Sequence, residues 1–215
     1  MALIEAEGLA KRVEERWLWR GLDIALAPGE RLAVRGPSGA GKTLLLRALA
    51  GLEPLEEGVI RYRDRELVGT TMPSYRAQVV YLAQRPAAVA GTVEDALRLP
   101  FRFRVHHGRP FPRDAILADL AALGRDETFL RRPAERLSGG EAQLVALLRA
   151  FAIAPQVLLL DEPAASLDEE ASDALEALVG AWLHADRSRA VMWTSHHAAQ
   201  LARVTDRSVW IGAAA

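Results

Sequence analysis

The chain has 215 residues, half of them hydrophobic, and it contains no cysteine. A chain of this length and composition can bury a full core, either as one large domain or as a domain with a sizeable insertion. The missing cysteines exclude disulfides, thiolate zinc sites and thiol nucleophiles, and the formal net charge of −1 argues against a dedicated nucleic-acid-binding protein.

The chain carries no pattern typical of secretion or of a membrane span. Glu5 and Glu7 interrupt the opening residues, so we expect no secretory leader. The longest apolar run, residues 144–160, is broken by Arg149 and Pro155 and is too short to cross a bilayer. We therefore expect a cytoplasmic protein that reaches a membrane only through a partner.

The first segments alternate between apolar and polar residues, as half-buried strands do. Residues 3–7 and 22–26 predict two strands of an antiparallel region. Trp17 and Trp19 lie between them, two positions apart, and would share a face if this segment is also a strand. Either ring could stack on an adenine base, although packing in the core or at an edge is the more usual place for such a side chain.

A glycine-rich loop follows, between a short apolar strand at residues 31–35 and an apolar helix at residues 44–50. It fits the pattern G-x-x-x-x-G-K-[ST] at every defined position. Its eight residues, called the P-loop below, are Gly36, Pro37, Ser38, Gly39, Ala40, Gly41, Lys42 and Thr43. The glycines let successive backbone N–H groups face a polyphosphate, and the helix N-terminus adds partial positive charge. We expect Lys42 to reach the β- and γ-phosphates and the Thr43 hydroxyl to bind Mg²⁺.

Two further strands are predicted at residues 58–62 and 78–84, and the second ends in Gln84. Beside a P-loop, an amide at this place could reach Mg²⁺ and the attacking water. A glutamine at a strand end is otherwise usually only solvated.

Helix-like patterns fill the next part of the chain, residues 92–137. Thr92 and Asp95 have capping-box spacing, and residues 113–123 have helical spacing. We interpret residues 92–137 as an inserted helical subdomain. Its basic and aromatic run at residues 101–107 is either a solvated surface with aromatics turned inward or a docking surface for a partner near the membrane.

The residues Leu137-Ser138-Gly139-Gly140-Glu141 open a long amphipathic helix, with Ser138 and Glu141 at capping-box spacing. Two glycines in a first helical turn lower helix propensity by about 1 kcal/mol each. This cost is tolerable where bare backbone must approach a ligand.

An entirely apolar strand is predicted at residues 157–160, and it ends in Asp161 and Glu162. Acidic groups at the carboxyl end of a buried parallel strand face the ligand crevice of the sheet. We expect Asp161 to hold Mg²⁺ and Glu162 to polarise a water for attack on the γ-phosphate.

The remaining residues predict one helix and two strands. The helix is expected at residues 166–185, starting with capping-box spacing between Ser166 and Glu169. The strands are expected at residues 190–194 and 207–211, and His196 comes just after the first of them. His196 could hydrogen-bond the γ-phosphate or the water, although a histidine at such a place is more often a surface residue.

In this order the motifs resemble those of the nucleotide-binding subunits of ABC transporters, over nearly the whole chain. The motifs that match are the P-loop, Gln84, residues 137–141, residues 160–163, residues 166–168 and His196. The resemblance implies an α/β fold, a P-loop NTPase core with an antiparallel β-subdomain and an inserted helical subdomain. Residues 1–215 would form one such domain, with its core in residues 1–91 and 138–215.

The resemblance also implies that two copies face head to tail with ATP and Mg²⁺ between them. ATP would lie between the P-loop of one copy and Ser138, Gly139, Gly140 and Glu141 of the other. The segment from Asp161 to Asp168 would link the two sites.

Roles for the remaining site residues follow from the same resemblance. Glu162 would be the general base, Gln84 and Asp161 would serve the metal and the water, and His196 would hold the γ-phosphate. Such a subunit is an ATPase that drives a separate membrane-spanning subunit and lies on the inner face of the cell membrane, with no nucleic-acid partner.

One departure from the family concerns the adenine base. The family usually has an aromatic residue near positions 11 to 13, but Lys11, Arg12 and Val13 stand there. Trp17 is our candidate for the stacking role, with Trp19 as the alternative, unless stacking is weak.

Within the family, the short length and the residues 81–104 and 193–196 look most like the ATP-binding subunits of small bacterial exporters of the Fet iron-efflux type. Subunits for haem or lipoprotein-type export are similar in size, so the cargo and the direction of transport stay open. A soluble ABC-type ATPase of DNA repair or translation is the alternative class. It is disfavoured because the chain has no long coiled-coil insertion and no cysteine zinc module.

Overall fold

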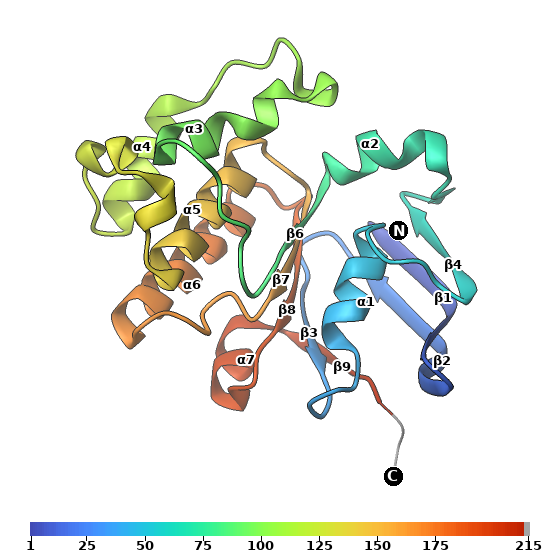
Figure 1. The fold of residues 1–215 in the computed structure, drawn as a ribbon. Coiled ribbons are helices and arrows are strands. Elements are labelled where there is room, and N and C mark those ends of the chain that lie inside the picture. Colours follow the sequence, from blue (N-terminus) through green and yellow to red (C-terminus); the bar gives the residue numbers. More distant parts are fainter. Residues whose placement is uncertain (213–215) are drawn as a thin grey trace.

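The structure is a computed structural model that describes residues 1–212, and it is built on two β-sheets (Figure 1). The first sheet is antiparallel, with the strand order β2-β1-β4-β5. Its strands are β1 (Ile4–Val13), β2 (Arg16–Leu26), β4 (Glu57–Tyr62) and β5 (Arg65–Glu66). The two N-terminal strands predicted from alternation are therefore present, and both are longer than expected because they continue to a tight turn between Val13 and Arg16.

The second sheet is parallel, with the strand order β6-β7-β8-β3-β9. Its strands are β3 (Arg31–Arg35), β6 (Val79–Leu82), β7 (Val157–Asp161), β8 (Ala190–Thr194) and β9 (Arg207–Trp210). Because the strands are parallel, the segments that carry the P-loop, Gln84, Glu162 and His196 all leave the sheet at one edge.

The helices alternate with these strands along the chain. They are α1 (Lys42–Leu49), α2 (Met72–Arg76), α3 (Val93–Arg98), α4 (Arg113–Ala122), α5 (Gly139–Ala152), α6 (Glu169–His184) and α7 (Ala198–Val204). Among residues 1–212, no helix is both long enough and apolar enough to cross a membrane.

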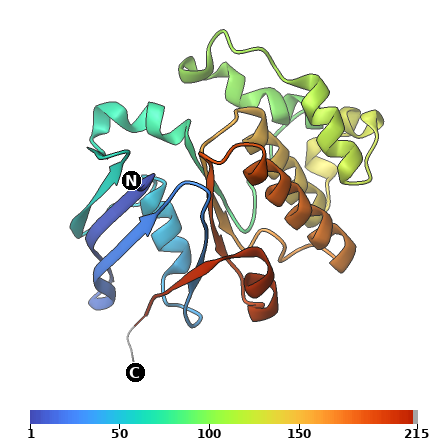
Figure 2. The ribbon, with the colours of Figure 1, turned by 180° about the vertical axis from the view of Figure 1, so that it is seen from behind.

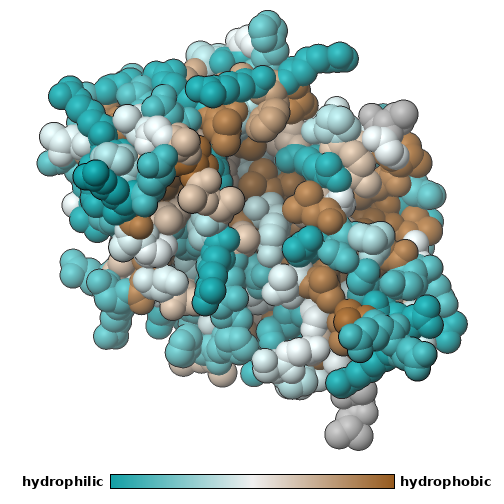
Figure 3. Space-filling model, in the orientation of Figure 1, coloured by the Kyte–Doolittle hydropathy of each residue, from teal (hydrophilic) through white to brown (hydrophobic). Residues whose placement is uncertain are grey.

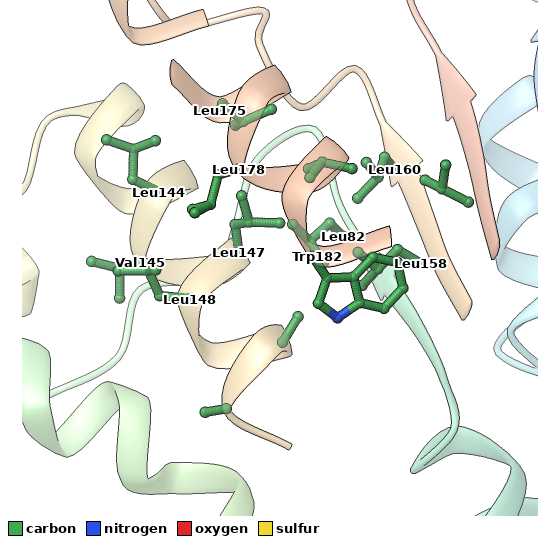
Figure 4. Packing of buried hydrophobic residues seen from close by; sticks show 14 of the residues in the cluster. Leu82, Leu144, Val145, Leu147, Leu148, Leu158, Leu160, Leu175, Leu178 and Trp182 are labelled. Carbon is green, nitrogen blue, oxygen red and sulfur yellow. The ribbon is translucent and has the colours of Figure 1, made fainter. Parts of the chain in front are cut away.

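Strand β7 divides the hydrophobic core into two halves. Its side chains alternate between the two faces of the sheet, and all of them are buried. Leu158 and Leu160 pack with the helices α5 and α6, as Figure 4 shows. Val157 and Leu159 pack on the other face with α1 and the antiparallel sheet. Helix α1 thus lies between the two sheets, while α5 and α6 cover the opposite face and α3 and α4 pack on these two helices (Figures 1 and 2).

Of three helix starts predicted from capping-box spacing, two are confirmed and the third is wrong. Both capping boxes, Thr92 with Asp95 and Ser138 with Glu141, are formed. The predicted start of the next helix at Ser166 is wrong: α6 begins at Glu169, and its cap is Asp168, whose carboxylate accepts a hydrogen bond from the backbone N–H of Ala171 at 2.8 Å. Ser166 is unavailable as a cap because it packs against the first turn of α5, next to Gly140.

The basic and aromatic run at residues 101–107 combines buried aromatic side chains with exposed apolar ones. Phe101 packs edge to face on Phe111, with ring centroids 5.5 Å apart. His106 is buried, and burial lowers the pKa of its imidazole. Phe103 and Val105 point outward, and the Phe103 side chain is 58% exposed. One face of this run is therefore structural and the other is available for contact.

Candidate active site

A cleft of about 400 Å³ lies where the P-loop meets the ends of β6, β7 and β8. Its lining residues are Val13, Leu18, Ser38, Gly39, Gly41, Lys42, Thr43, Leu44, Gln84, Glu162 and His196. The structure thus brings the P-loop together with Gln84, Glu162 and His196, the three predicted catalytic residues, although His196 comes far after the loop in the sequence. The cleft is at the carboxyl edge of a parallel sheet, where ligands bind in folds of this kind.

The P-loop wraps around the N-terminus of α1. Gly41 precedes the helix with a φ of 88°, a left-handed conformation that other residues rarely adopt. Lys42 is buried, and its ammonium group donates hydrogen bonds to the carbonyl oxygens of Gly36 (2.9 Å) and Pro37 (3.1 Å). The loop is therefore preformed around a lysine whose charge, within residues 1–212, is met by carbonyl dipoles and by no carboxylate, and a polyphosphate would be a stronger partner. Gly36, Pro37 and Ala40 are not among the residues that line the cleft.

Glu162 is at the centre of the three residues that were predicted to be catalytic. Its carboxylate accepts a hydrogen bond from the Gln84 amide at 3.0 Å. The other carboxylate oxygen lies 2.6 Å from Nε2 of His196. The backbone φ of Glu162 is +50°, an unfavourable conformation for a side chain of this kind. Such strain persists only where the surroundings hold it, and it is commonest at functional sites.

Asp161, the predicted metal ligand, lies just behind this group and does not line the cleft. Its carboxylate is 3% exposed. Oδ2 accepts a hydrogen bond from the Tyr81 hydroxyl, and Oδ1 accepts one from the Thr194 hydroxyl, both at 2.9 Å. A carboxylate buried with only neutral donors favours a nearby cation.

The residues present fit Mg²⁺ better than a metal that needs a full protein cage. In the described part of the chain, no group of three or more His, Asp and Glu side chains is arranged to hold a metal ion. Mg²⁺ is typically bound through one or two protein ligands, with water and phosphate oxygens completing its shell. Thr43 and Gln84 in the cleft, with Asp161 behind it, could supply the protein ligands.

The residues Ser138, Gly139, Gly140 and Glu141 lie outside this cleft, at the N-terminus of α5. Ser138 Oγ accepts from the backbone N–H of Glu141, and the Glu141 carboxylate accepts from the backbone N–H of Ser138 at 3.0 Å. Arg132 also donates to Glu141, and this hydrogen bond is the main cause that lowers the pKa of the Glu141 carboxyl group. Asp168 is close to them in the fold, because the segment before it packs on Gly140. The predicted site residues therefore form two separate groups within one chain.

Trp17 does not join the cleft. In the ladder between β1 and β2, Lys11 pairs with Trp19 and the next residue, Arg12, pairs with Trp17. One step along β1 thus corresponds to two steps along β2, so Leu18 is an extra residue at a β-bulge. The expectation that the two tryptophans share a face is wrong for this reason: Trp19 is buried, whereas Trp17 is exposed between the guanidinium groups of Arg12 and Arg20.

Sequence reasoning gave no site role to five residues at or beside the cleft, one of which is Leu44 on α1. Val13 and Leu18 form its wall on the side of the antiparallel sheet. Leu18 is placed there by the bulge, which no pattern in the sequence predicts. Tyr81 and Thr194 could have been suspected, because both are hydroxyl residues at the ends of the strands that flank β7.

Comparison with known proteins gives a consistent result. A family model described as ABC transporter matches residues 19–165. The cytochrome c biogenesis ATP-binding export protein CcmA 2 of Cupriavidus metallidurans is 41% identical over 182 residues, 83% of this chain and 82% of that protein. Protein STAR1 of Oryza sativa subsp. japonica is 34% identical over 94% of this chain. The sulfate/thiosulfate import ATP-binding protein CysA of Xylella fastidiosa is 37% identical over 78% of this chain. The chain spans 58% of STAR1 and 48% of CysA.

Solved structures share the fold. The ATP-binding subunit of an ABC transporter has a TM-score of 0.86 at 24% identity, over 98% of this chain and 86% of that chain. A dimeric post-hydrolysis state of an ATP-binding cassette with ADP and Pi has a TM-score of 0.82 at 23% identity, over 97% and 94%. These likenesses confirm the predicted fold class.

Proposed function

The chain belongs to the ABC transporter family, and from this premise we propose that it is an ATP-hydrolysing subunit that powers a separate membrane-spanning transporter subunit. The observation that supports this most is the contact of Glu162 with both Gln84 and His196 in the cleft that holds the P-loop. A carboxylate held by two polar side chains beside a phosphate-binding loop is the arrangement that a general base for water needs.

In the proposed reaction, the P-loop N–H groups and Lys42 bind the β- and γ-phosphates of ATP. Glu162 takes a proton from the attacking water, while Gln84 and His196 keep the carboxylate and the water in line with the γ-phosphate. Thr43, Gln84 and Asp161 would hold a Mg²⁺ ion, whose charge offsets that of the phosphates. The products are ADP and phosphate.

We further propose that a second copy completes the site, head to tail. The residues 138–141 of one chain lie outside its own cleft, and the N-terminus of α5 carries the partial positive charge and the bare backbone that suit a phosphate. In the assembled pair, Ser138, Gly139, Gly140 and Glu141 of each copy would face the nucleotide bound by the P-loop of the other. Asp168 would lie near the junction of the two sites.

A groove beside the helical segment residues 92–137 is our candidate contact for the membrane subunit. It is lined by residues of β6, of the loop after Gln84, of α5 and by Pro100, and it has a volume of about 170 Å³. Figure 3 shows a hollow with apolar residues around it between α3 and α2. Phe103 and Val105 are exposed on the same segment. A groove of this size suits an apolar anchor side chain on a partner helix.

Export is the direction we propose, with a metal such as iron as one possible cargo and haem or a lipoprotein-type substrate as others. The relative named as an export protein is matched over 82% of its length, whereas the one named for sulfate import is matched over 48%. Cargo is selected by the membrane subunit, so co-purification of the tagged chain from its own cells identifies it. Recovery of nucleic acid or ribosomes instead would favour a soluble ATPase of repair or translation.

The first prediction tests the base. Glu162→Gln keeps the shape of the side chain but removes its basicity, so we expect ATP binding to persist while hydrolysis falls by roughly 10²- to 10⁴-fold. Phosphate release measures the rate, and a fluorescent ATP analogue measures binding. Glu66→Gln, an exposed change on β5, is the matched control and should hydrolyse ATP as the unchanged chain does. Full turnover in Glu162→Gln would show that another group is the base.

A further inference from the structure

Asp161 is held from both sides by hydroxyl groups of the neighbouring strands. Tyr81 on β6 and Thr194 on β8, called the hydroxyl pair below, donate to its two carboxylate oxygens at 2.9 Å each. Thr194 is directly opposite Asp161 in the β7–β8 ladder, whereas Tyr81 pairs with Leu159 and reaches across.

Thr194 has a second contact that involves Glu162. The backbone N–H of Glu162 donates to Thr194 Oγ1 at 3.0 Å and also to the Thr194 carbonyl oxygen at 3.2 Å. This is the residue whose φ is +50°. Since Thr194 is fully buried, water cannot replace its hydroxyl, and a strained turn of this kind needs such a partner to persist.

We propose that Thr194 and Tyr81 are positioning residues of the active site: the hydroxyl pair fixes the Asp161 carboxylate for the metal ion, and Thr194 also holds the turn that aims Glu162 at Gln84 and His196. This inference rests on the proposed ATPase function. It predicts a larger effect on catalysis for Thr194 than for Tyr81. The Tyr81 hydroxyl bonds the Asp161 carboxylate, whereas the Thr194 hydroxyl bonds both Asp161 and the backbone of Glu162.

The test removes each hydroxyl with little change of shape. Thr194→Val should lower kcat by about 10- to 100-fold, because a buried bond to a charged group and the support of the Glu162 turn are both lost. Thr194→Ser retains the hydroxyl and should recover most of this loss. Tyr81→Phe should raise the Mg²⁺ concentration needed for half-maximal activity several-fold, with a smaller change in kcat at saturating Mg²⁺.

A second readout does not depend on turnover. Binding of a fluorescent ATP analogue is titrated with Mg²⁺, starting from EDTA. Thr194→Val and Tyr81→Phe should bind the analogue in EDTA as the unchanged chain does, yet need more Mg²⁺ to reach the metal-bound signal. Thr205→Val is the matched control, since it removes a threonine hydroxyl whose partner among the described residues is the Leu201 carbonyl at the end of α7.

The outcomes distinguish a failure of the proposed ATPase function from a failure of the positioning role. If the unchanged chain does not hydrolyse ATP, the proposed function fails, while the Mg²⁺ titration still tests the hydroxyl pair. If Thr194→Val matches Thr205→Val in both kcat and Mg²⁺ midpoint, the positioning role is wrong. If Thr194→Ser is as impaired as Thr194→Val, the residue acts through packing and the inference is also overturned. Should Thr194→Val not fold, an unchanged Mg²⁺ midpoint in Tyr81→Phe overturns it.

Discussion

Single residues on the side of the antiparallel sheet decide how a nucleotide base would be held. Val13 and Leu18 line the cleft there, and neither offers a flat ring or a hydrogen-bonding group. Trp17 is close in sequence, yet its ring is occupied by Arg12 and Arg20. We infer that a base at this end would be held by aliphatic contact alone, so phosphate contacts would supply most of the affinity.

This arrangement predicts that an aromatic ring at position 13 strengthens binding. Val13→Tyr would give the base a surface on which to stack, and we expect the dissociation constant for ATP to fall by about tenfold, as base–aromatic stacking does elsewhere. Trp17→Ala should change it less than about twofold, because this ring lies outside the cleft. Isothermal titration calorimetry measures both. If Trp17→Ala weakened binding strongly and Val13→Tyr had no effect, Trp17 would be the stacking residue after all.

At the scale of elements, two helical glycines have opposite surroundings. A Cβ added at Gly140, in the first turn of α5, would come within 2.8 Å of the Ser166 carbonyl oxygen, so the segment before α6 can approach α5 only because this residue has no side chain. A Cβ added at Gly180, inside α6, would meet no atom within 4 Å. The first glycine is required by packing, whereas the second only lowers the helix propensity of α6.

The two glycines therefore predict stability changes of opposite sign. Gly180→Ala should raise the free energy of unfolding by about 0.5–1 kcal/mol. Gly140→Ala should lower it by roughly 1–3 kcal/mol, because backbone must shift to admit the methyl group. Urea denaturation at one temperature measures both variants. A stabilising Gly140→Ala would mean that α5 and the Ser166 segment can separate without cost, and that packing does not require a glycine at position 140.

At the scale of the whole molecule, the separation of the P-loop from residues 138–141 is the feature with most consequence. A site divided between two copies can be repaired by mixing two differently damaged chains. Lys42→Ala damages the P-loop half of each site, and Ser138→Arg damages the other half by blocking the N-terminus of α5. Each variant alone would have two damaged sites in the dimer, whereas a mixed dimer has one site intact.

Mixing the two variants in equal amounts should restore about a quarter of the ATPase activity, since half of the dimers are mixed and each of these has one of two sites. Phosphate release before and after mixing measures this. Each variant by itself is the control, and it should stay inactive. Failure of the mixture to gain any activity would indicate that one chain holds a complete site.

The sequence alone determined the motifs, their order and the fold class. The P-loop pattern is local, because its glycines, Lys42 and the following helix act through backbone conformation over eight residues. Runs of alternating or continuous apolar residues located most strands, and capping residues located the starts of α3 and α5. Asp161 and Glu162 were recognisable because they end a buried strand.

Only the tertiary structure decided which of these residues meet. The strand order places β7 between β6 and β8, and so brings Gln84, Glu162 and His196 within hydrogen-bond distance. The bulge at Leu18 turns Trp17 outward, and the segment that packs on Gly140 leaves Asp168 as the cap of α6, which begins at Glu169. Register, bulges and contacts between helices depend on partners far apart in the chain, and for that reason no local pattern could predict them.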